Sequence, residues 1–396
     1  MTPALDQASL PLPVRQGRSR TANPLPELDY PLLVAVLALL AFGVVMVASA
    51  SLHKVAADPY FFTQRHLLAI LLGFVGALVF FTLPLELWRR FSVPLYLLGL
   101  LLVALVLFPQ IGKEVNGARR WIALGDSYSL QASEFMKPLL ILFLAAYLSR
   151  RREQIYLSAT ASLAPLAWTM AAAVLVLLEP DFGTAAVLAA TALGLLWLGG
   201  MPLRYFAVLF AGFVAGVVAL VVYWPYRLKR VTSFLDPWAD PTDSGYQLVQ
   251  SLIALGRGEW FGVGLGNGIQ KQYYLPEAHT DFIVAVIGEE LGLLGLLLLL
   301  FLFGVVTWRA NRLALTAEGN GNLFAALLAQ GIGLWIALQA AVNIGVNFGL
   351  LPTKGLTLPF LSYGGNSVMV TMAAMGWLFR IDRDNRRAGA AKGGRP

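Results

Sequence analysis

Ionisable and turn-forming residues of this sequence gather in five groups that border long apolar segments. The groups are 116–121 together with 131–137, 179–184, 227–247, 276–292 and 352–367. A charged side chain at membrane depth is costly to bury, so such residues are functional candidates by default. Each group also has a purely structural interpretation.

The first group pairs a carboxylate with an ammonium. Glu134 and Lys137 are three residues apart at the start of an apolar segment, so they share one face of a helix. They form either a local ion pair behind an N-cap at Ser133 or a charged wall of an outward-facing cavity. Arg119 and Arg120 stand beside a tryptophan. They either anchor the chain at the membrane interface or bind phosphate, which suits the guanidinium fork.

The second and third groups lie in a turn and in a long polar loop. Glu179 and Asp181 separate two apolar segments, where two carboxylates need a partner, water or a cation unless Asp181 caps the next helix. Arg227 and Arg230 stand near the start of the polar loop. The glycine-rich run 262–268 in this loop fits no phosphate-binding motif, so we predict a flexible turn there.

Asp281 and the segment 352–367 belong to the last two groups. Asp281 stands directly before an apolar segment, a position that suits a helix cap as well as a functional carboxylate. The segment 352–367 is rich in Pro and Gly. Irregular backbone at membrane depth is tolerated where it is packed in protein or lines a polar cavity. We therefore predict a re-entrant loop at this segment.

Ten apolar segments must position these groups. The 396-residue chain is 58% apolar and 13% charged, whereas soluble domains are about 25% charged. Helices of these lengths cross a hydrocarbon core of about 30 Å. We predict an all-α integral membrane protein with ten transmembrane helices and one large extracytoplasmic loop. The predicted spans are 30–50, 67–85, 91–108, 134–148, 162–178, 183–199, 204–224, 282–306, 323–347 and 365–380.

The charge pattern orients these spans. Lys and Arg are concentrated in both termini and in the short loops at 89–90, 150–152 and 309–312, and the positive-inside rule places that side in the cytoplasm. The net charge of +7 is therefore a topology signal, and nucleic-acid binding is not expected. The absence of cysteine excludes disulfides and thiolate metal sites.

Three regions follow along the chain. We predict a disordered cytoplasmic tail at 1–28, a membrane domain at 29–380 whose large outer loop is 225–281, and a basic, disordered cytoplasmic tail at 381–396. The outer side then holds a polar cavity lined by Arg, Lys and acids. Such a cavity suits an anionic, membrane-bound substrate, but the pattern alone does not separate an enzyme from a flippase.

Six blocks of the sequence resemble, in the same order, the SEDS family of bacterial cell-wall polymerases, which act in shape, elongation, division and sporulation. The blocks are 116–121, 131–137, 179–184, 236–247, 276–292 and 352–367. The stretches 275–281 and 351–359 are more similar to the division members than to the elongation members. Ala132 and Asn366 depart from the Pro and Ser that are usual at these loop positions.

This resemblance implies a peptidoglycan glycosyltransferase that polymerises lipid II at the outer face of the cytoplasmic membrane during cell division. It implies transfer with inversion and places Asp281 at the position of the catalytic base. Basic residues would meet the pyrophosphate charge. The candidates for substrate binding are Arg65, Arg120, Lys137, Arg227 and Arg230, with Ser362 as a weaker polar contact. Glu134 and Asp181 would orient these cations or bind a divalent metal, Mg or Mn, which the resemblance also implies.

The resemblance further implies partners. These are a class B penicillin-binding transpeptidase similar to FtsI and the division proteins FtsQ, FtsL and FtsB, at the septum. A lipid II flippase and a non-catalytic division scaffold are the alternative hypotheses. A flippase needs polar residues along a route through the bilayer, whereas the inner halves of the predicted spans are nearly uncharged. A scaffold predicts that Asp281 is dispensable.

Overall fold

The computed structural model describes residues 28–54, 58–115, 117–125, 128–157, 159–243, 245–353 and 355–393. The predicted disordered tail at 1–28 therefore lies outside the described residues, apart from Leu28. The side chains of Arg227 and Arg230 also lie outside them, whereas the backbone at both positions is described.

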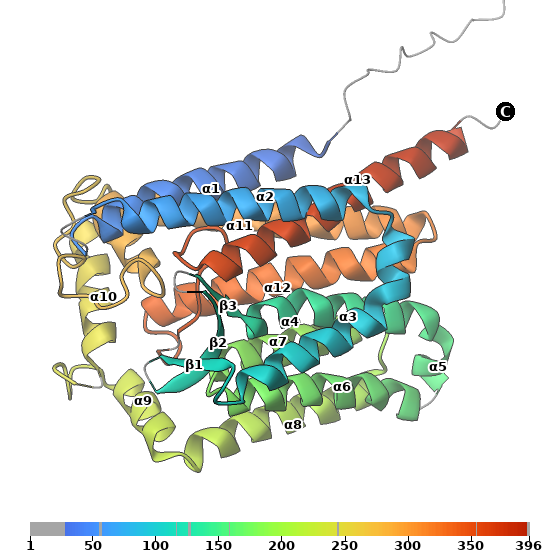
Figure 1. Cartoon of the computed structure of the whole chain (residues 1–396), viewed down its shortest axis with the longest axis horizontal. Coiled ribbons are helices and arrows are strands. Elements are labelled where there is room, and N and C mark those ends of the chain that lie inside the picture. Colours follow the sequence, from blue (N-terminus) through green and yellow to red (C-terminus); the bar gives the residue numbers. More distant parts are fainter. Residues whose placement is uncertain are drawn as a thin grey trace, which may run out of the picture.

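Each of the ten predicted spans overlaps one long helix, and these helices form a bundle (Figure 1). Among the described residues, seven helices are long and apolar enough to cross a membrane, and α6 and α7 hold shorter apolar stretches. The fold is therefore a multi-span helical bundle. Its long helices are α1 (Tyr30–Ser51), α2 (Phe61–Thr82), α3 (Leu85–Val106), α4 (Ala132–Arg150), α6 (Ala159–Leu178), α7 (Phe182–Leu198), α8 (Leu203–Val222), α11 (Ile283–Gly319), α12 (Leu323–Asn347) and α13 (Gly365–Gly393).

Helix α12 lies at the centre of the bundle. It packs against α4, α7 and α11, while α2 runs along α13 (Figure 1). Helix α8 lies at the periphery, where Leu209 is its buried residue and most of its other apolar side chains are exposed. A helix that is apolar all round and exposed in this way is typical of contact with lipid. Residues carried by α12 are therefore largely shielded from both lipid and water.

Short elements connect the long helices. Helices α5 (Arg152–Leu157), α9 (Pro225–Leu235) and α10 (Tyr246–Gly258) lie in loops, and the last two belong to the predicted outer loop 225–281. The strands β1 (Gly112–Val115), β2 (Ala118–Leu124) and β3 (Tyr128–Gln131) form an antiparallel sheet in the order β1-β2-β3. Trp121 pairs with Gln131 in this sheet, which leads the chain directly into α4.

Two predicted boundaries are wrong. The stretch after Arg380, predicted to be a disordered tail, continues α13 as far as Gly393. Its ion pairs Arg380–Asp384 and Arg386–Asp382 join side chains four residues apart, a spacing that supports a helix outside the membrane. The predicted span 282–306 belongs to a helix that runs to Gly319 and is broken at Gly292.

The break at Gly292 is a packing requirement. Its φ of +63° lies in the region that favours glycine. A side chain there would also meet the backbone of the outer loop, since a Cβ would lie 2.5 Å from the nitrogen of Gly262. The break divides α11 into a short outer part, which follows Asp281, and a long part that continues through the bundle.

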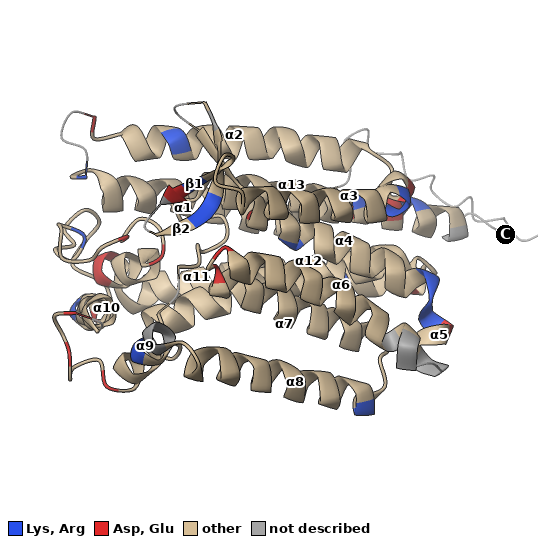
Figure 2. Cartoon of the chain, turned by 60° about the horizontal axis from the view of Figure 1, so that its bottom comes forward, with Lys and Arg blue, Asp and Glu red and all other residues tan. Residues whose placement is uncertain are grey.

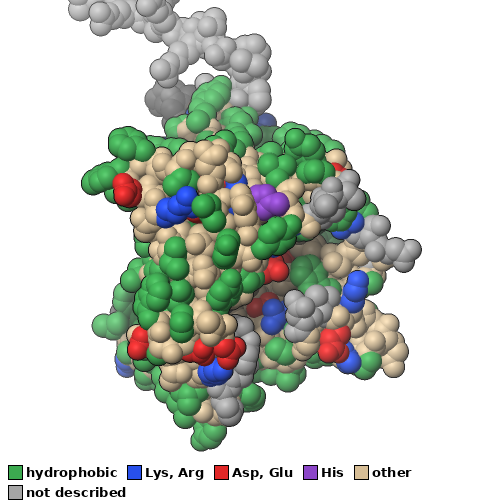
Figure 3. All heavy atoms as spheres, turned by 90° about the vertical axis from the view of Figure 1, so that its left-hand side faces the viewer, with side chains coloured by type: hydrophobic (Ala, Val, Ile, Leu, Met, Phe, Trp, Pro, Cys, Tyr) green, Lys and Arg blue, Asp and Glu red, His purple; other side chains and the backbone are tan. Residues whose placement is uncertain are grey.

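Charged side chains gather mostly towards the two ends of the bundle (Figure 2). Between the ends the helices are largely apolar, as a membrane-spanning bundle requires. The end with α9 and α10 is hollowed near its middle, and acidic and basic side chains lie at the margin of the hollow (Figure 3). This end is the predicted outer face.

Candidate active site at the start of α11

Asp281 lies directly before α11. The N-cap of α11 is Phe282, so of the two alternatives for Asp281 the helix cap is not the one observed. The side chain of Asp281 is partly exposed. Gly355 approaches it so closely that a Cβ on this glycine would lie 3.0 Å from Oδ2 of Asp281. The carboxylate therefore rests against the backbone of the segment 352–367.

The backbone of Asp281 is also held. Its carbonyl oxygen accepts hydrogen bonds from Nδ2 of Asn343 and of Asn347, each at 3.0 Å. Both amides belong to α12, the central helix. A partly exposed carboxylate on a fixed backbone is suited to receive a proton from a bound substrate.

Aromatic side chains join α2 to the loop that carries Asp281, residues 276–282, which we name the Asp281 loop. The ring of His279 stacks on that of Tyr363 at 5.5 Å, and Phe62 packs edge-on against both rings. Burial lowers the pKa of His279 to about 4, so its imidazole is neutral near pH 7. The guanidinium of Arg65 lies beside Tyr363 and 4.4 Å from the centre of the Phe61 ring. Arg65 is thus the predicted cation that the structure places next to the Asp281 loop.

Glu134 and Lys137 form a buried ion pair. Nζ of Lys137 lies 2.8 Å from Oε1 of Glu134 and also donates to Oε1 of Gln339 at 2.9 Å. The side chain of Lys137 is only 1% exposed. The local ion pair is therefore present, but the predicted N-cap at Ser133 is wrong because Gln131 is the N-cap of α4. In this conformation Lys137 is enclosed rather than open to a substrate.

Arg120 and Asp181 each bind backbone groups at the turn between α6 and α7. Arg120 donates from Nε to the carbonyl of Glu179 at 3.0 Å and from Nη2 to that of Pro180. Asp181 caps α7 by accepting from the backbone N–H of Thr184 at 3.1 Å. The capping role foreseen for Asp181 is therefore confirmed. Arg119, by contrast, pairs with Glu114 across the sheet at 3.3 Å.

The donor set does not fit a resident divalent metal. Among the described residues, no three His, Asp or Glu side chains come together in a way that would hold a metal ion. Glu134 is paired with Lys137, and the carboxylate of Asp181 is used in the cap. No step of the reaction is therefore assigned to a metal on these residues.

Ser362 stabilises the segment 352–367 through a hydrogen bond within that segment. It is fully buried, and its Oγ accepts the backbone N–H of Leu358 at 2.8 Å. Ser362 is therefore enclosed in this conformation, and its contact with substrate stays a prediction. Arg227 and Arg230 lie on α9, and their side chains are outside the described residues. Lys229 between them pairs with Asp243 at 2.6 Å on the surface.

We expect Ser362→Ala to lower stability and to leave catalysis intact. The substitution strands the buried N–H of Leu358, a loss that costs about 1–3 kcal/mol. Thermal unfolding in detergent should shift downward, while the activity per folded molecule stays within about twofold of wild type. A large loss of activity without loss of stability would restore Ser362 as a substrate contact.

Two buried acids at the break of α11 form an ionic cluster that the sequence did not single out as a unit. Glu290 pairs with Lys271 and accepts from Oγ of Ser49 on α1. Glu289 pairs with Arg257 at 2.9 Å and accepts from the backbone N–H of Ile269 at the same distance. All of these partners except Ser49 belong to the outer loop 225–281, so the cluster fastens this loop to α1 and α11.

The glycine-rich run 262–268 is part of this attachment. The backbone N–H groups of Val263 and Gly264 donate to the carbonyls of Glu289 and Glu290, at 2.9 and 3.1 Å. Gly266 donates to the carboxylate of Glu290 at 3.1 Å. The run is a turn, as predicted, but it is held along the break in α11 by these bonds rather than free of the helix. Its glycines allow the backbone to approach the helix closely.

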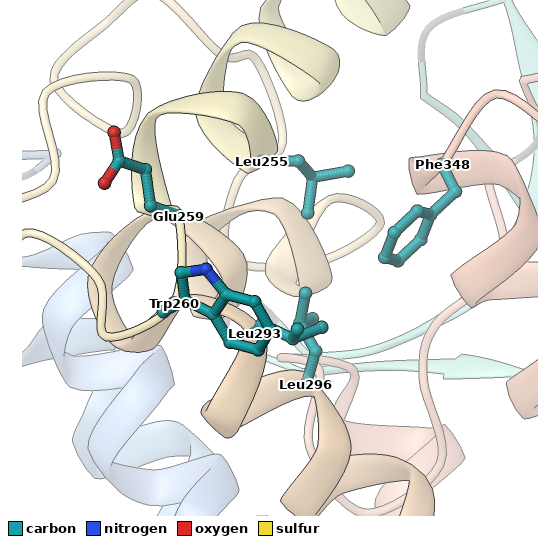
Figure 4. A pocket seen from close by; sticks show the side chains of 6 residues that line it. All are labelled: Leu255, Glu259, Trp260, Leu293, Leu296 and Phe348. Atoms are coloured by element: carbon teal, nitrogen blue, oxygen red, sulfur yellow. The ribbon is translucent and has the colours of Figure 1, made fainter.

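An apolar pocket lies beside the same break, between α10, α11 and the end of α12. Leu255, Trp260, Leu293, Leu296 and Phe348 surround about 410 Å³, and the carboxylate of Glu259 points away from them (Figure 4). This lining offers no cation to a pyrophosphate. The pocket is therefore distinct in chemistry from the polar site around Asp281.

Comparisons with known proteins match most of the chain. Residues 30–387 match the model of the cell cycle protein family of FtsW, RodA and SpoVE. A relative from Allochromatium vinosum, described as a probable peptidoglycan glycosyltransferase FtsW, is 53% identical and covers 96% of this chain and 94% of its own. A relative from Methylococcus capsulatus with the same description is 51% identical and covers 89% of each chain.

Solved structures agree in fold. A chain from a peptidoglycan synthase complex, described as coordinating polymerization and crosslinking, has a TM-score of 0.76 at 33% identity and covers 91% of this chain and 99% of its own. The rod shape determining protein RodA of Thermus thermophilus has a TM-score of 0.68 at 30% identity and covers 91% of this chain and 98% of its own. The helical bundle is therefore shared over nearly its whole length.

Proposed function

Since this chain belongs to the FtsW, RodA and SpoVE family of cell cycle proteins, we propose that it polymerises lipid II at the outer face of the cytoplasmic membrane, with Asp281 as the base. Its activity is that of a peptidoglycan glycosyltransferase with a role in cell division, as described for relatives about 50% identical to it. The substrate, the side of the membrane and the role of Asp281 are the proposed parts.

The setting of Asp281 carries the proposal. Its carboxylate is partly exposed, while its carbonyl is held by two side-chain amides from the central helix. Arg65 lies nearby through its contact with Tyr363, which binds the backbone of His279 at 2.9 Å. A fixed carboxylate with a cation close by suits a reaction in which a hydroxyl loses a proton and an anion departs.

The proposed transfer needs one residue that acts as a base. Asp281 takes the proton of an acceptor sugar hydroxyl, whose oxygen forms a bond to the anomeric carbon of the donor. The bond from that carbon to the pyrophosphate breaks, and the lipid pyrophosphate leaves with the electron pair. Attack from the opposite face inverts the anomeric centre. Pyrophosphate is a stable leaving group, so a second residue that acts as an acid is not required.

Cations must meet the charge of the departing pyrophosphate. Arg65 is the most direct candidate because it lies beside the Asp281 loop. Arg120 already binds the turn at 179–180, and Lys137 is enclosed by Glu134 and Gln339. In this conformation these two cations therefore shape the site, and the charge of Lys137 is matched by that of Glu134. Arg227 and Arg230 remain proposed contacts on α9.

The proposal extends to location and partners. The chain is a multi-pass membrane protein with a transpeptidase partner, a pairing supported by the relative from a complex that polymerises and crosslinks. We place both termini in the cytoplasm and the complex at the septum, with a class B penicillin-binding transpeptidase and FtsQ, FtsL and FtsB as partners. The basic residues at the termini and short loops support this orientation.

Purified components test the polymerase function. The chain is prepared with its transpeptidase partner, whose own active serine has been replaced, and is given fluorescent lipid II. We expect long glycan strands on a gel from the complex and none from the partner alone. Lipid II that stays unpolymerised by a folded, intact complex would contradict the proposal and favour the scaffold.

The flippase alternative gives a different result. Vesicles that contain the chain alone would then move lipid II between leaflets faster than empty vesicles. We expect no such acceleration, because Lys, Arg, Asp and Glu are sparse between the ends of the bundle (Figure 2). Accelerated movement without strand formation would favour the flippase.

A further inference from the structure

Three amide side chains follow one another along one face of α12. Gln339, Asn343 and Asn347 are spaced four residues apart, which places them in line on the helix. Each is at most 1% exposed within a largely apolar helix. Buried amides require hydrogen-bond partners, so their partners identify what this row of side chains holds.

The row binds the two loops that form the candidate active site. Gln339 donates from Nε2 to the carbonyl of Thr357 at 2.9 Å, and Asn343 donates to the carbonyl of Leu356. Asn343 and Asn347 both donate to the carbonyl of Asp281. Asn347 also accepts, through Oδ1, the backbone N–H of Ala285 at 3.0 Å. One helix thus fixes both the Asp281 loop and the segment that carries Gly355.

The row also reaches the buried ion pair. Oε1 of Gln339 accepts from Nζ of Lys137 at 2.9 Å and from Nε1 of Trp335 at 2.8 Å. The ion pair of Lys137 and Glu134 is therefore linked to the loop at 356–357 through a single side chain. The separate groups that the sequence placed at 131–137, 276–292 and 352–367 meet on α12.

The side-chain oxygen of Asn343 lacks a hydrogen bond to any of the described residues in this arrangement. This Oδ1 is buried, while Nδ2 of the same side chain makes two bonds. An apolar side chain of the same size would avoid this cost but would leave the buried carbonyl of Leu356 without its donor. The amide is therefore required by the two carbonyls that it holds, those of Leu356 and Asp281.

We propose that Asn343 and Asn347 are positioning residues for Asp281. They hold its carbonyl from inside the bundle, so that its carboxylate keeps one orientation against Gly355 while a sugar hydroxyl approaches. This inference rests on the proposed function, since it concerns the base of that reaction. Neither amide touches the substrate. Their effect passes through the backbone of Asp281.

Asn343→Leu tests the proposal because it removes the donor with little change in volume. We expect kcat for lipid II polymerisation to fall about tenfold to hundredfold, the size of loss that a misplaced reacting group produces. KM for lipid II should stay within about twofold. Asn322→Ala is the matched control, because it removes an amide cap at the other end of α12. This control should leave both constants near those of wild type.

The same substitution in the Asp281→Asn background separates positioning from a general structural role. If Asn343 acts through Asp281, the residual rate should not fall further when both residues are changed. An equal fold-loss in both backgrounds, or a rise in KM with kcat unchanged, would overturn the positioning role. Full activity of Asp281→Asn alone would instead refute the proposed function, so the two failures are distinguishable.

A second variant keeps the test decisive if Asn343→Leu does not accumulate. Asn347→Ser keeps a hydroxyl next to the Asp281 carbonyl and shortens its reach. It is measured in the same two backgrounds, with folding followed by elution from a sizing column. We expect the same loss of kcat, which should likewise disappear when Asp281 is already replaced. A loss that persists in that background would overturn the proposal.

Discussion

Asp281→Asn should reduce the rate of glycan polymerisation about 10²- to 10⁴-fold, the contribution expected of a positioned general base. Asparagine has nearly the same shape and leaves the carbonyl contacts to Asn343 and Asn347 in place. The fold should therefore survive while proton removal fails. The measurement is the initial rate at saturating lipid II, made on complexes of matched purity and thermal stability.

A control for this prediction lies in the same outer loop. Asp243→Asn makes the same chemical change in a surface pair with Lys229. Exposed pairs of this kind contribute little, so its rate should equal that of wild type. Asp281→Glu, which keeps the carboxylate but moves it, should fall between the two. Near-normal rates for Asp281→Asn would remove this residue from the reaction.

Lys271→Met should destabilise the protein by about 3–5 kcal/mol, because it leaves the carboxylate of Glu290 buried without its cation. Lys271 and Glu290 are each at most 1% exposed, so water cannot replace the lost partner. Glu290 also receives bonds from Ser49 and Gly266. Its isolation would therefore loosen the attachment of the outer loop to α1 and α11. Thermal unfolding in detergent measures the loss.

The double variant Lys271→Met with Glu290→Gln is the control for this second prediction. It removes both charges, while the amide oxygen still accepts from Ser49 and Gly266. Replacing a whole buried pair is often close to neutral, so most of the stability should return. A double variant as unstable as Lys271→Met would show that packing of the lysine stem, rather than charge, holds the loop.

The positions of the long apolar helices could be predicted because few backbone structures are stable in a lipid bilayer. A chain in hydrocarbon must satisfy its own backbone hydrogen bonds, and apolar segments long enough to cross the bilayer therefore become helices. The parts outside the membrane obey no such rule. The sheet at 112–131 and the helical end of α13 at 381–393 are polar and short, so their sequences resemble loops and tails.

Asp281 could be singled out from the sequence, but the side chains that hold it could not. Asp281 stood out through its charge and its place before an apolar segment. The amides that hold it are uncharged and lie within an apolar helix, so they carried little signal beyond their spacing at 339, 343 and 347. Ser362 and Lys137 were read as contacts to substrate because residue type does not reveal burial. Their enclosure depends on packing across distant parts of the chain.

A base at the outer face requires that strands form on that side of the membrane, and reconstituted vesicles measure this. The complex is reconstituted at about one copy per vesicle with an affinity tag after Pro396, and the tag separates vesicles by orientation. A water-dispersible, short-chain lipid II is then added outside. We expect strands from vesicles whose tags are enclosed, since Asp281 then faces the added substrate. We expect none from vesicles whose tags face out. Strands from the second population at an equal rate would contradict a base at the outer face.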